Sequence, residues 1–172
     1  MSSLVFDLET TGLEIDSTIH CLCIHDTRSG EDTTYNDTGN SPSITTGVTH
    51  LDDSSCWLVG HNVVGFDLPV IQNRYPFLNG NGRTIDTLIL SRLCYPDILD
   101  RDAKTNKIPK WLRGRHSLES WGYRLNCLKG DYNNEQTDWS KWTPELEDYC
   151  RQDVLLTLKL YNHFQKVLAG LP

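Results

Sequence analysis

The amino-acid sequence predicts an α/β protein, in which a mixed sheet of about five strands is flanked by helices. The main observation is the order of the segments: strand-like segments come first as a hairpin and then alternate with helical ones. In addition, 172 residues with 38% hydrophobic content suffice for one sizeable core. Since no repeat or linker divides the chain, residues 1–172 are expected to form a single domain.

The predicted strands are short apolar or alternating segments bounded by polar residues. They cover residues 5–8, 19–26, 31–35, 56–60 and 83–85. A turn at residues 27–30 joins the second strand to the third, so the first three are expected to form an antiparallel meander. Residues 36–46, rich in Asn, Ser, Gly and Thr, are predicted to be a loop.

Helices are predicted where apolar residues recur at helical spacing and start or stop residues flank them. Asp86 is expected to cap one helix, and Thr143 followed by Pro144 is a typical helix start. The predicted helices cover residues 48–53, 66–75, 87–93, a helix that starts at 117–120, and a long last helix from 144 to about 168. Residues 126–140 are predicted to be a loop, and residues 95–115 are a polar stretch that carries Lys and Arg.

Charge and cysteine usage narrow the class of protein. A net charge of −7 argues against a general nucleic-acid coat protein, but it is compatible with an enzyme whose acidic site holds cations. No signal peptide or membrane span is evident, so we expect a cytoplasmic protein with no membrane partner. The six cysteines contain no Cys-x-x-Cys pair. Cys21 and Cys23 alternate along a predicted strand, which favours core thiols over a zinc site.

The first predicted strand ends in two acids, Asp7 and Glu9. In an extended chain residues i and i+2 point to the same face, so both carboxylates are aimed at the same place. Two unit charges about 4 Å apart repel by roughly 4 kcal/mol at a protein surface. A hydrogen-bond network, a proton or a cation must therefore lie between them.

Two later stretches add further polar groups. Asp67 lies at the start of a predicted helix, with Asn62 just beyond the preceding strand. Tyr149 and Asp153 are four residues apart on the last helix, and so share one face with apolar residues. Each acid also has an ordinary interpretation: a capping or strand-end role for Asp7, Glu9 and Asp67, and an ion pair with Arg151 or a distant Lys for Asp153. As a set, the acids could instead form a cage for hard divalent cations.

The stretches FDLETTGL, HNVVGFD and YCRQD resemble the three motifs of the DnaQ-like 3′–5′ exonucleases, which have a ribonuclease H-like fold. The tyrosine in the third motif is typical of the DEDDy branch. IDTLILSRL and HSLESWGYRL resemble the proofreading domain of family A DNA polymerases from short-tailed, T-odd-like bacteriophages. The resemblance runs from about residue 4 to 167. In that family a polymerase region follows, and this sequence has none, so a free-standing nuclease, a part of a split polymerase and a fragment all fit.

The resemblance implies a 3′–5′ exodeoxyribonuclease that releases 5′-mononucleotides by a two-metal-ion mechanism with Mg²⁺ or Mn²⁺. Asp7, Glu9 and Asp153 would hold one ion, Asp7 would bridge to a second, and Asp67 would reach the second. Tyr149 would orient the attacking water. Substrate contacts would come from Thr10, Leu13 and Asn62, although Leu13 by itself looks like a core residue. The expected partners are single-stranded DNA or a primer 3′ end and a separate DNA polymerase for which it proofreads; RNA also fits, and the chain is expected to be a monomer.

The polar stretch at residues 95–115, here called the basic segment, concentrates cations in an acidic chain. It can be a solvated loop or an irregular arm that binds phosphates, with Trp111 stacking on a base. The expected substrate contacts on this arm are Lys104, Lys107, Lys110, Trp111 and Arg113. The main alternative function is a catalytically silent ribonuclease H-like module that binds nucleic acid or a polymerase. A calcium-binding protein and a ribonuclease H-type endonuclease fit the residues less well.

Overall fold

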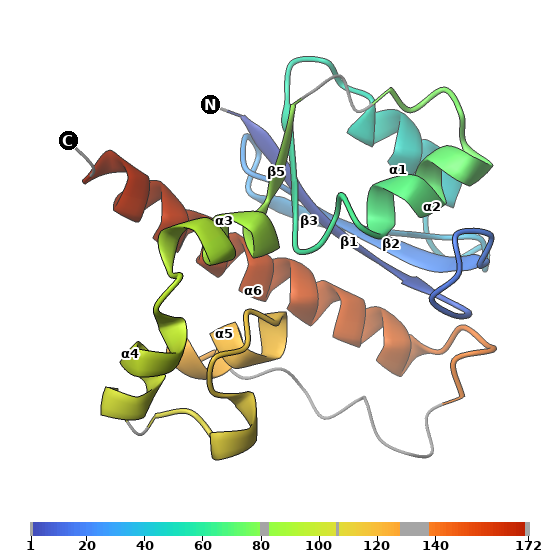
Figure 1. Cartoon of the computed structure of the whole chain (residues 1–172). Helices are drawn as coiled ribbons and strands as arrows, with labels where there is room; N and C mark the ends of the chain where they lie inside the picture. Colours follow the sequence, from blue (N-terminus) through green and yellow to red (C-terminus); the bar gives the residue numbers. More distant parts are fainter. Residues whose placement is uncertain (1, 80–82, 106, 128–137, 171–172) are drawn as a thin grey trace.

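The computed structural model describes residues 2–79, 83–105, 107–127 and 138–170. Its centre is a five-stranded sheet with the strand order β3-β2-β1-β4-β5 (Figure 1). The strands are β1 (Ser3–Thr10), β2 (Ile19–Asp26), β3 (Glu31–Asn36), β4 (Trp57–Gly60) and β5 (Thr84–Asp86). β1, β2 and β3 pair antiparallel, whereas β4 pairs parallel with β1 and β5 parallel with β4. The predicted mixed sheet with an antiparallel meander is therefore confirmed.

Helices cover both faces of this sheet (Figure 1). They are α1 (Ile44–Leu51), α2 (Asp67–Arg74), α3 (Thr87–Cys94), α4 (Ile98–Thr105), the 3₁₀ helix η1 (Lys110–Leu112), α5 (Leu118–Arg124) and α6 (Pro144–Ala169). On one face, Leu4, Phe6 and Leu8 of β1 pack in a core with residues of α1 and α2. On the other face α6 lies across β1 and β2, and α3 and α5 contact α6.

The first helix begins earlier than predicted. α1 starts at Ile44 instead of residue 48, because the Ser43 hydroxyl caps it by accepting a hydrogen bond from the Thr46 N–H at 3.2 Å. The Asp37 carboxylate also accepts from the Ile44 N–H at 3.1 Å. The predicted loop at residues 36–46 thus supplies the first turn of the helix. The helix packs tightly on the sheet, since a Cβ on Gly47 would lie 2.6 Å from the ring of Tyr35.

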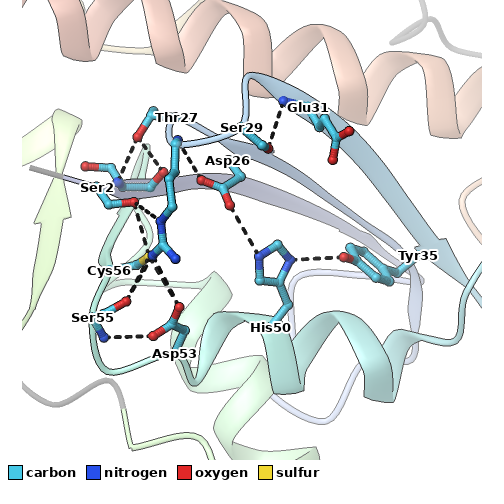
Figure 2. A network of polar contacts seen from close by, with 12 residues as sticks. Ser2, Asp26, Thr27, Ser29, Glu31, Tyr35, His50, Asp53, Ser55 and Cys56 are labelled. Atoms are coloured by element: carbon cyan, nitrogen blue, oxygen red, sulfur yellow. Dashed lines mark hydrogen bonds and ion pairs between the residues drawn. The ribbon is translucent and has the colours of Figure 1, made fainter.

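A polar network ties the β2–β3 hairpin to α1 and to the chain before β4 (Figure 2). His50 contacts the Tyr35 hydroxyl at 3.0 Å through Nδ1 and the Asp26 carboxylate at 3.8 Å through Nε2. On the other side of the hairpin, Arg28 donates to Ser55 at 2.9 Å and to the Cys56 thiol at 2.8 Å. The contacts of Asp26 and Arg28 lie at the end of the sheet opposite the acidic motif, because Asp26 pairs with Leu4 near the start of β1.

The basic segment has more regular structure than the sequence indicates. It contains α4 and η1, and its anchor is Asp102, which is buried. The Arg124 guanidinium donates to both Asp102 carboxylate oxygens at 2.8 and 3.1 Å, and the Gly114 N–H donates at 3.0 Å. Burial opposes the ionised form of Asp102, but the hydrogen bonds from Arg124 and Gly114, together with the positive charges of Arg124 and Arg113, outweigh it. The pKa of Asp102 therefore lies below its ordinary value. The prediction of an irregular loop was wrong because this ion pair joins α4 to α5.

The last helix starts as predicted, with the Thr143 hydroxyl accepting from the Leu146 N–H at 3.1 Å. Asp86 likewise caps α3, as predicted. Part of the predicted loop at 126–140, residues 128–137, lies outside the described residues. Across the described ranges, no helix combines the length and apolar character needed to cross a bilayer.

Candidate active site

Asp7 and Glu9 lie near the end of β1, on the sheet face that α6 covers. The preceding odd-numbered residue, Val5, packs with residues of α6, while the even-numbered residues face the opposite core. Asp7 and Glu9 are both partly exposed within an otherwise buried strand. The strand pairing places Cys23 opposite Asp7 and Cys21 opposite Glu9. The two acids therefore share one face, as the sequence predicts.

A cleft of about 520 Å³ opens at this end of β1. All five predicted catalytic side chains line it: Asp7, Glu9, Asp67, Tyr149 and Asp153. Its remaining lining comes from Leu8, Thr10, Thr11, Gly12, Leu13, His61, Asn62, Phe66 and Trp139. We call this the carboxylate cleft. The structure brings the residues of the three motifs together, and their chemical roles remain predictions.

Asp67 is the first residue of α2 and is buried. The capping alternative is wrong, because Phe66 occupies the N-cap position without a side-chain hydrogen bond. The Leu8 backbone N–H donates to the Asp67 carboxylate and links α2 to β1. Burial raises the pKa of Asp67 to about 7, and the negative charges of Asp86 and Asp153 add to the rise. A cation beside these carboxylates would oppose that effect.

α6 supplies Tyr149 and Asp153 from adjacent turns. Asp153 is buried, and the alternative of an ion pair with Arg151 is wrong, because Arg151 instead contacts Glu147 at 3.1 Å and Asp148 at 2.7 Å. The Tyr149 ring meets Trp139 edge to face, with 6.5 Å between the ring centroids. Sequence reasoning missed Trp139 because it lies in a predicted loop with no local motif.

The loop after β4 carries His61 and Asn62 into the cleft. Asp86 holds this loop, because its carboxylate accepts from the Asn62 N–H at 3.0 Å and from the Val64 N–H at 3.1 Å. The same carboxylate caps α3 by accepting from the Leu88 N–H at 2.8 Å. Asn62 has a φ of 64°, a conformation that few side chains tolerate but Asn does. Sequence reasoning found the capping role of Asp86 but missed this second role.

Thr10 and Leu13 differ in what they offer a substrate. Thr10 is buried, and its hydroxyl donates to the Gly12 carbonyl at 2.5 Å, so it shapes the loop after β1. Leu13 is 87% exposed at the edge of the cleft, so the core interpretation of this residue is wrong. An apolar side chain held in solvent beside an acidic cleft is available for contact with a base.

None of the predicted side chains of the basic segment lines the carboxylate cleft. Lys104, Lys107 and Lys110 are exposed, and Trp111 is 60% exposed. The Arg113 guanidinium donates to the Ile108 carbonyl at 3.3 Å, within the segment itself. These residues can contact only a substrate that extends beyond the cleft.

The donor set of the cleft fits divalent cations. Carboxylate oxygens of Asp7 and Glu9 and the sulfur of Cys150 all lie within 4.8 Å of one another. Asp67 and Asp153 line the same cleft, and carboxylate oxygens are the ligands that Mg²⁺ and Mn²⁺ prefer.

The family model for 3′–5′ exonucleases matches residues 1–169 of this chain. The chain belongs to this family and is a 3′–5′ exonuclease domain. Members of the family generally use divalent metal ions. The match covers all three motifs that line the cleft, so the family predicted from the motifs is confirmed.

Among curated proteins, the chain is similar to the DNA-directed DNA polymerases of Enterobacteria phage T3 and Escherichia phage T7. Sequence identity is 30% and 28%, over 91% of this chain and 26% of each polymerase. The chain therefore spans about a quarter of the length of these relatives.

Solved structures share the fold at lower identity. A nuclease in its apo form aligns with a TM-score of 0.67 at 20% identity, over 95% of this chain and 72% of that one. E. coli Exonuclease I in complex with a dT13 oligonucleotide aligns with a TM-score of 0.61 at 15% identity, over 97% of this chain and 42% of that one. A family B DNA polymerase from Pyrobaculum calidifontis aligns with a TM-score of 0.56 at 20% identity, over 96% of this chain and 24% of that one. The ribonuclease H-like fold is thus confirmed.

Proposed function

We propose that this exonuclease domain removes 5′-mononucleotides from the 3′ end of single-stranded or frayed DNA, with two divalent cations, Mg²⁺ or Mn²⁺, at the carboxylate cleft. The observation that carries the proposal is the meeting of four acids and one tyrosine, from β1, α2 and α6, in one cleft. Residues so far apart in sequence have no structural need to bring carboxylates together in one cleft. Burial, with the negative charges of Asp86 and Asp153, raises the pKa of Asp67 there.

Each acid has a proposed role. Asp7, Glu9 and Asp153 hold one cation, and Asp7 and Asp67 face a second. When bound, the cations would activate a water molecule and stabilise the charge that builds on the phosphate and on the leaving 3′-oxygen. The geometry in support is that Asp67 and Asp153 are buried while Asp7 and Glu9 are partly open to the cleft. Substrate thus reaches the cleft from the side of the acidic pair.

Tyr149 marks the tyrosine branch of the family, and its role is to orient the attacking water. Its phenol is held by the edge of the Trp139 ring within the cleft. Leu13 and Asn62, at the edge of the same cleft, are placed to contact the terminal nucleotide, and Thr10 shapes the loop that carries Leu13. Lys104, Lys107, Lys110, Trp111 and Arg113 contact phosphates and bases further along the strand.

The biological role that we propose is proofreading for a DNA polymerase. The support is the similarity to two phage DNA polymerases, of which this chain covers 26%. We also propose that residues 1–172 form one domain that acts as a monomer in the cytoplasm, built around the single described sheet.

The experiment that tests the activity is digestion of 5′-labelled single-stranded DNA and RNA with Mg²⁺ or Mn²⁺. A stepwise ladder that shortens from the 3′ end of DNA is expected, and EDTA should stop it. Internal cuts would indicate an endonuclease instead. No cleavage of either substrate, with intact binding, would indicate a silent binding module.

A further inference from the structure

Three buried thiols meet behind the acidic pair. Cys21, Cys23 and Cys150 are 0%, 2% and 0% exposed. Their sulfur atoms all lie within 4.8 Å of one another. We call these residues the thiol triad; none of the three lines the carboxylate cleft.

The three sulfur atoms come from two elements that are distant in sequence, β2 and α6. Cys21 and Cys23 are two residues apart on β2 and so point to the same face, the face that α6 covers. Cys150 reaches the same spot from α6, where its thiol donates to the Asp7 carbonyl at 3.3 Å. The Cys23 thiol contacts the Glu147 carbonyl at 3.9 Å. The sequence pattern Cys-x-Cys shows only two of these ligands.

The spacing of the sulfurs suits a single metal ion. At a metal–sulfur distance of about 2.3 Å, tetrahedral geometry puts sulfur atoms roughly 3.8 Å apart. The triad is therefore within about 1 Å of a ligating arrangement. Thiolate ligands select soft ions such as zinc, cadmium and monovalent copper over magnesium. The backbone carbonyl oxygen of Asp7, which accepts a hydrogen bond from the Cys150 thiol, is a further metal ligand available on the same side.

We propose that the thiol triad is a binding site for one soft, thiophilic metal cation, separate from the hard-cation site at the carboxylates. Each ligating thiol gives up its proton to solvent as the ion enters, and no oxidation takes place. Because the ion would join β2 to α6, it would stabilise the folded state by an amount that rises with the logarithm of the free ion concentration above the dissociation constant. The proposal goes beyond the exonuclease activity and does not depend on it.

The two cation sites adjoin, because the Cys150 sulfur also lies within 4.8 Å of carboxylate oxygens of Asp7 and Glu9. A test must therefore keep the carboxylates occupied while the thiols are probed. Excess Mg²⁺ does this, since it competes at oxygen ligands and binds thiolates poorly.

The test is a titration of the reduced protein with Cd²⁺ in excess Mg²⁺, followed by the ultraviolet absorption of cadmium–thiolate bonds. One equivalent is expected to bind and to raise the midpoint of thermal unfolding. Cys150→Ser and the double variant Cys21→Ser/Cys23→Ser should each lower the affinity for Cd²⁺ at least about a hundredfold. Loss of a residue that only hydrogen-bonds to a metal ligand already lowers metal affinity by up to about a hundredfold. The matched control is Cys94→Ser/Cys127→Ser, which removes two thiols outside the triad and should bind like the parent.

A second measurement needs no variant. Cadmium-113 NMR of the parent protein distinguishes sulfur ligands from oxygen ligands, and we expect a resonance in the range of thiolate coordination. A resonance in the oxygen range would overturn the proposal, as would unchanged Cd²⁺ binding in the Cys21→Ser/Cys23→Ser variant. Unchanged binding in the Cys21→Ser/Cys23→Ser variant would mean that the Cd²⁺ ion is held without these two thiols, by Cys150 and the neighbouring carboxylates.

Discussion

The carboxylate cleft and the basic segment are both polar, but the protein builds them in opposite ways. The cleft takes its acids from three elements, buries two of them and fixes its walls through backbone contacts such as Leu8 to Asp67. The basic segment takes its lysines from one stretch of chain and leaves them exposed. Its anchor, the Asp102 carboxylate, is buried and pairs with the Arg124 guanidinium of α5.

This difference indicates which substitutions should have large effects on activity or stability and which should have small ones. Charges in a buried cleft interact strongly, so removal of one group should change activity or stability steeply. Exposed charges are screened by water and salt, so their contributions should be small and roughly additive. The following predictions test this contrast, from the largest expected effect to the smallest.

Asp7→Ala and Asp153→Ala should each reduce cleavage at least about a thousandfold, because loss of a proposed cation ligand would remove several kcal/mol of transition-state stabilisation. Folding and much of the DNA binding should persist. The measurement is single-turnover cleavage of labelled DNA at saturating Mg²⁺. Asp148→Ala is the matched control, since this acid is exposed on the same helix and should leave the rate unchanged. Near-normal turnover in Asp7→Ala would contradict the proposed cation site.

Asp67→Asn should stabilise the cation-free protein at alkaline pH. Because the pKa of Asp67 is about 7 in the folded chain and about 4 unfolded, its contribution to stability is complete below about pH 4 and is lost as the pH rises through about 7. Above that range the variant should be more stable by up to about 4 kcal/mol. Thermal unfolding with EDTA across this pH range measures the effect. If the unfolding midpoints of parent and variant change with pH in parallel, the pKa of Asp67 is not raised in the folded protein.

Tyr149→Phe should slow cleavage about ten- to a hundredfold, less than loss of a cation ligand, because the carboxylates remain. It should also change the pH–rate profile if the hydroxyl prepares the water. The control is Tyr161→Phe, which removes a tyrosine hydroxyl from the same helix, one that contacts the Ser3 hydroxyl at 3.2 Å. A loss equal to that of Asp153→Ala would contradict this division of roles.

The same contrast explains how much of the protein the sequence predicts. β2 was predicted with its observed bounds, and the shared face of Asp7 and Glu9 follows from strand geometry alone. Motif residues at the ends of regular elements were therefore placed correctly. α1 and α4 were missed or shifted because a side-chain cap at Ser43 and a long-range ion pair at Asp102 decide them.

Residues whose role depends on a distant contact were also missed. Trp139 enters the cleft from outside any motif, and Asp86 holds the Asn62 loop in addition to its predicted cap. Cys150 completes a cluster with a Cys-x-Cys pair more than a hundred residues earlier in the chain. No local pattern encodes such pairs, because they arise only when segments distant in sequence pack together.

The smallest effect is expected for the basic segment. A net charge of −7 disfavours long-range attraction for DNA, and we propose that the exposed lysines of the basic segment hold the strand beyond the cleft. Changing Lys104, Lys107 and Lys110 together to Ala should weaken the binding of all sequences alike. Each lost phosphate contact on a single strand should make the slope of log K against log salt shallower by about 0.7, hence by about 2 in total.

Fluorescence anisotropy with labelled single-stranded DNA at several salt concentrations measures this slope. The control, Arg74→Ala/Lys159→Ala/Lys166→Ala, removes the same net charge from exposed positions on α2 and α6, and so separates a local contact from a general change in field. Cleavage of a substrate too short to leave the cleft should be unchanged in both variants, because none of these side chains lines it. If the lysine variant keeps the parent's affinity and salt slope, the segment is a solvated surface and the cleft alone holds the DNA.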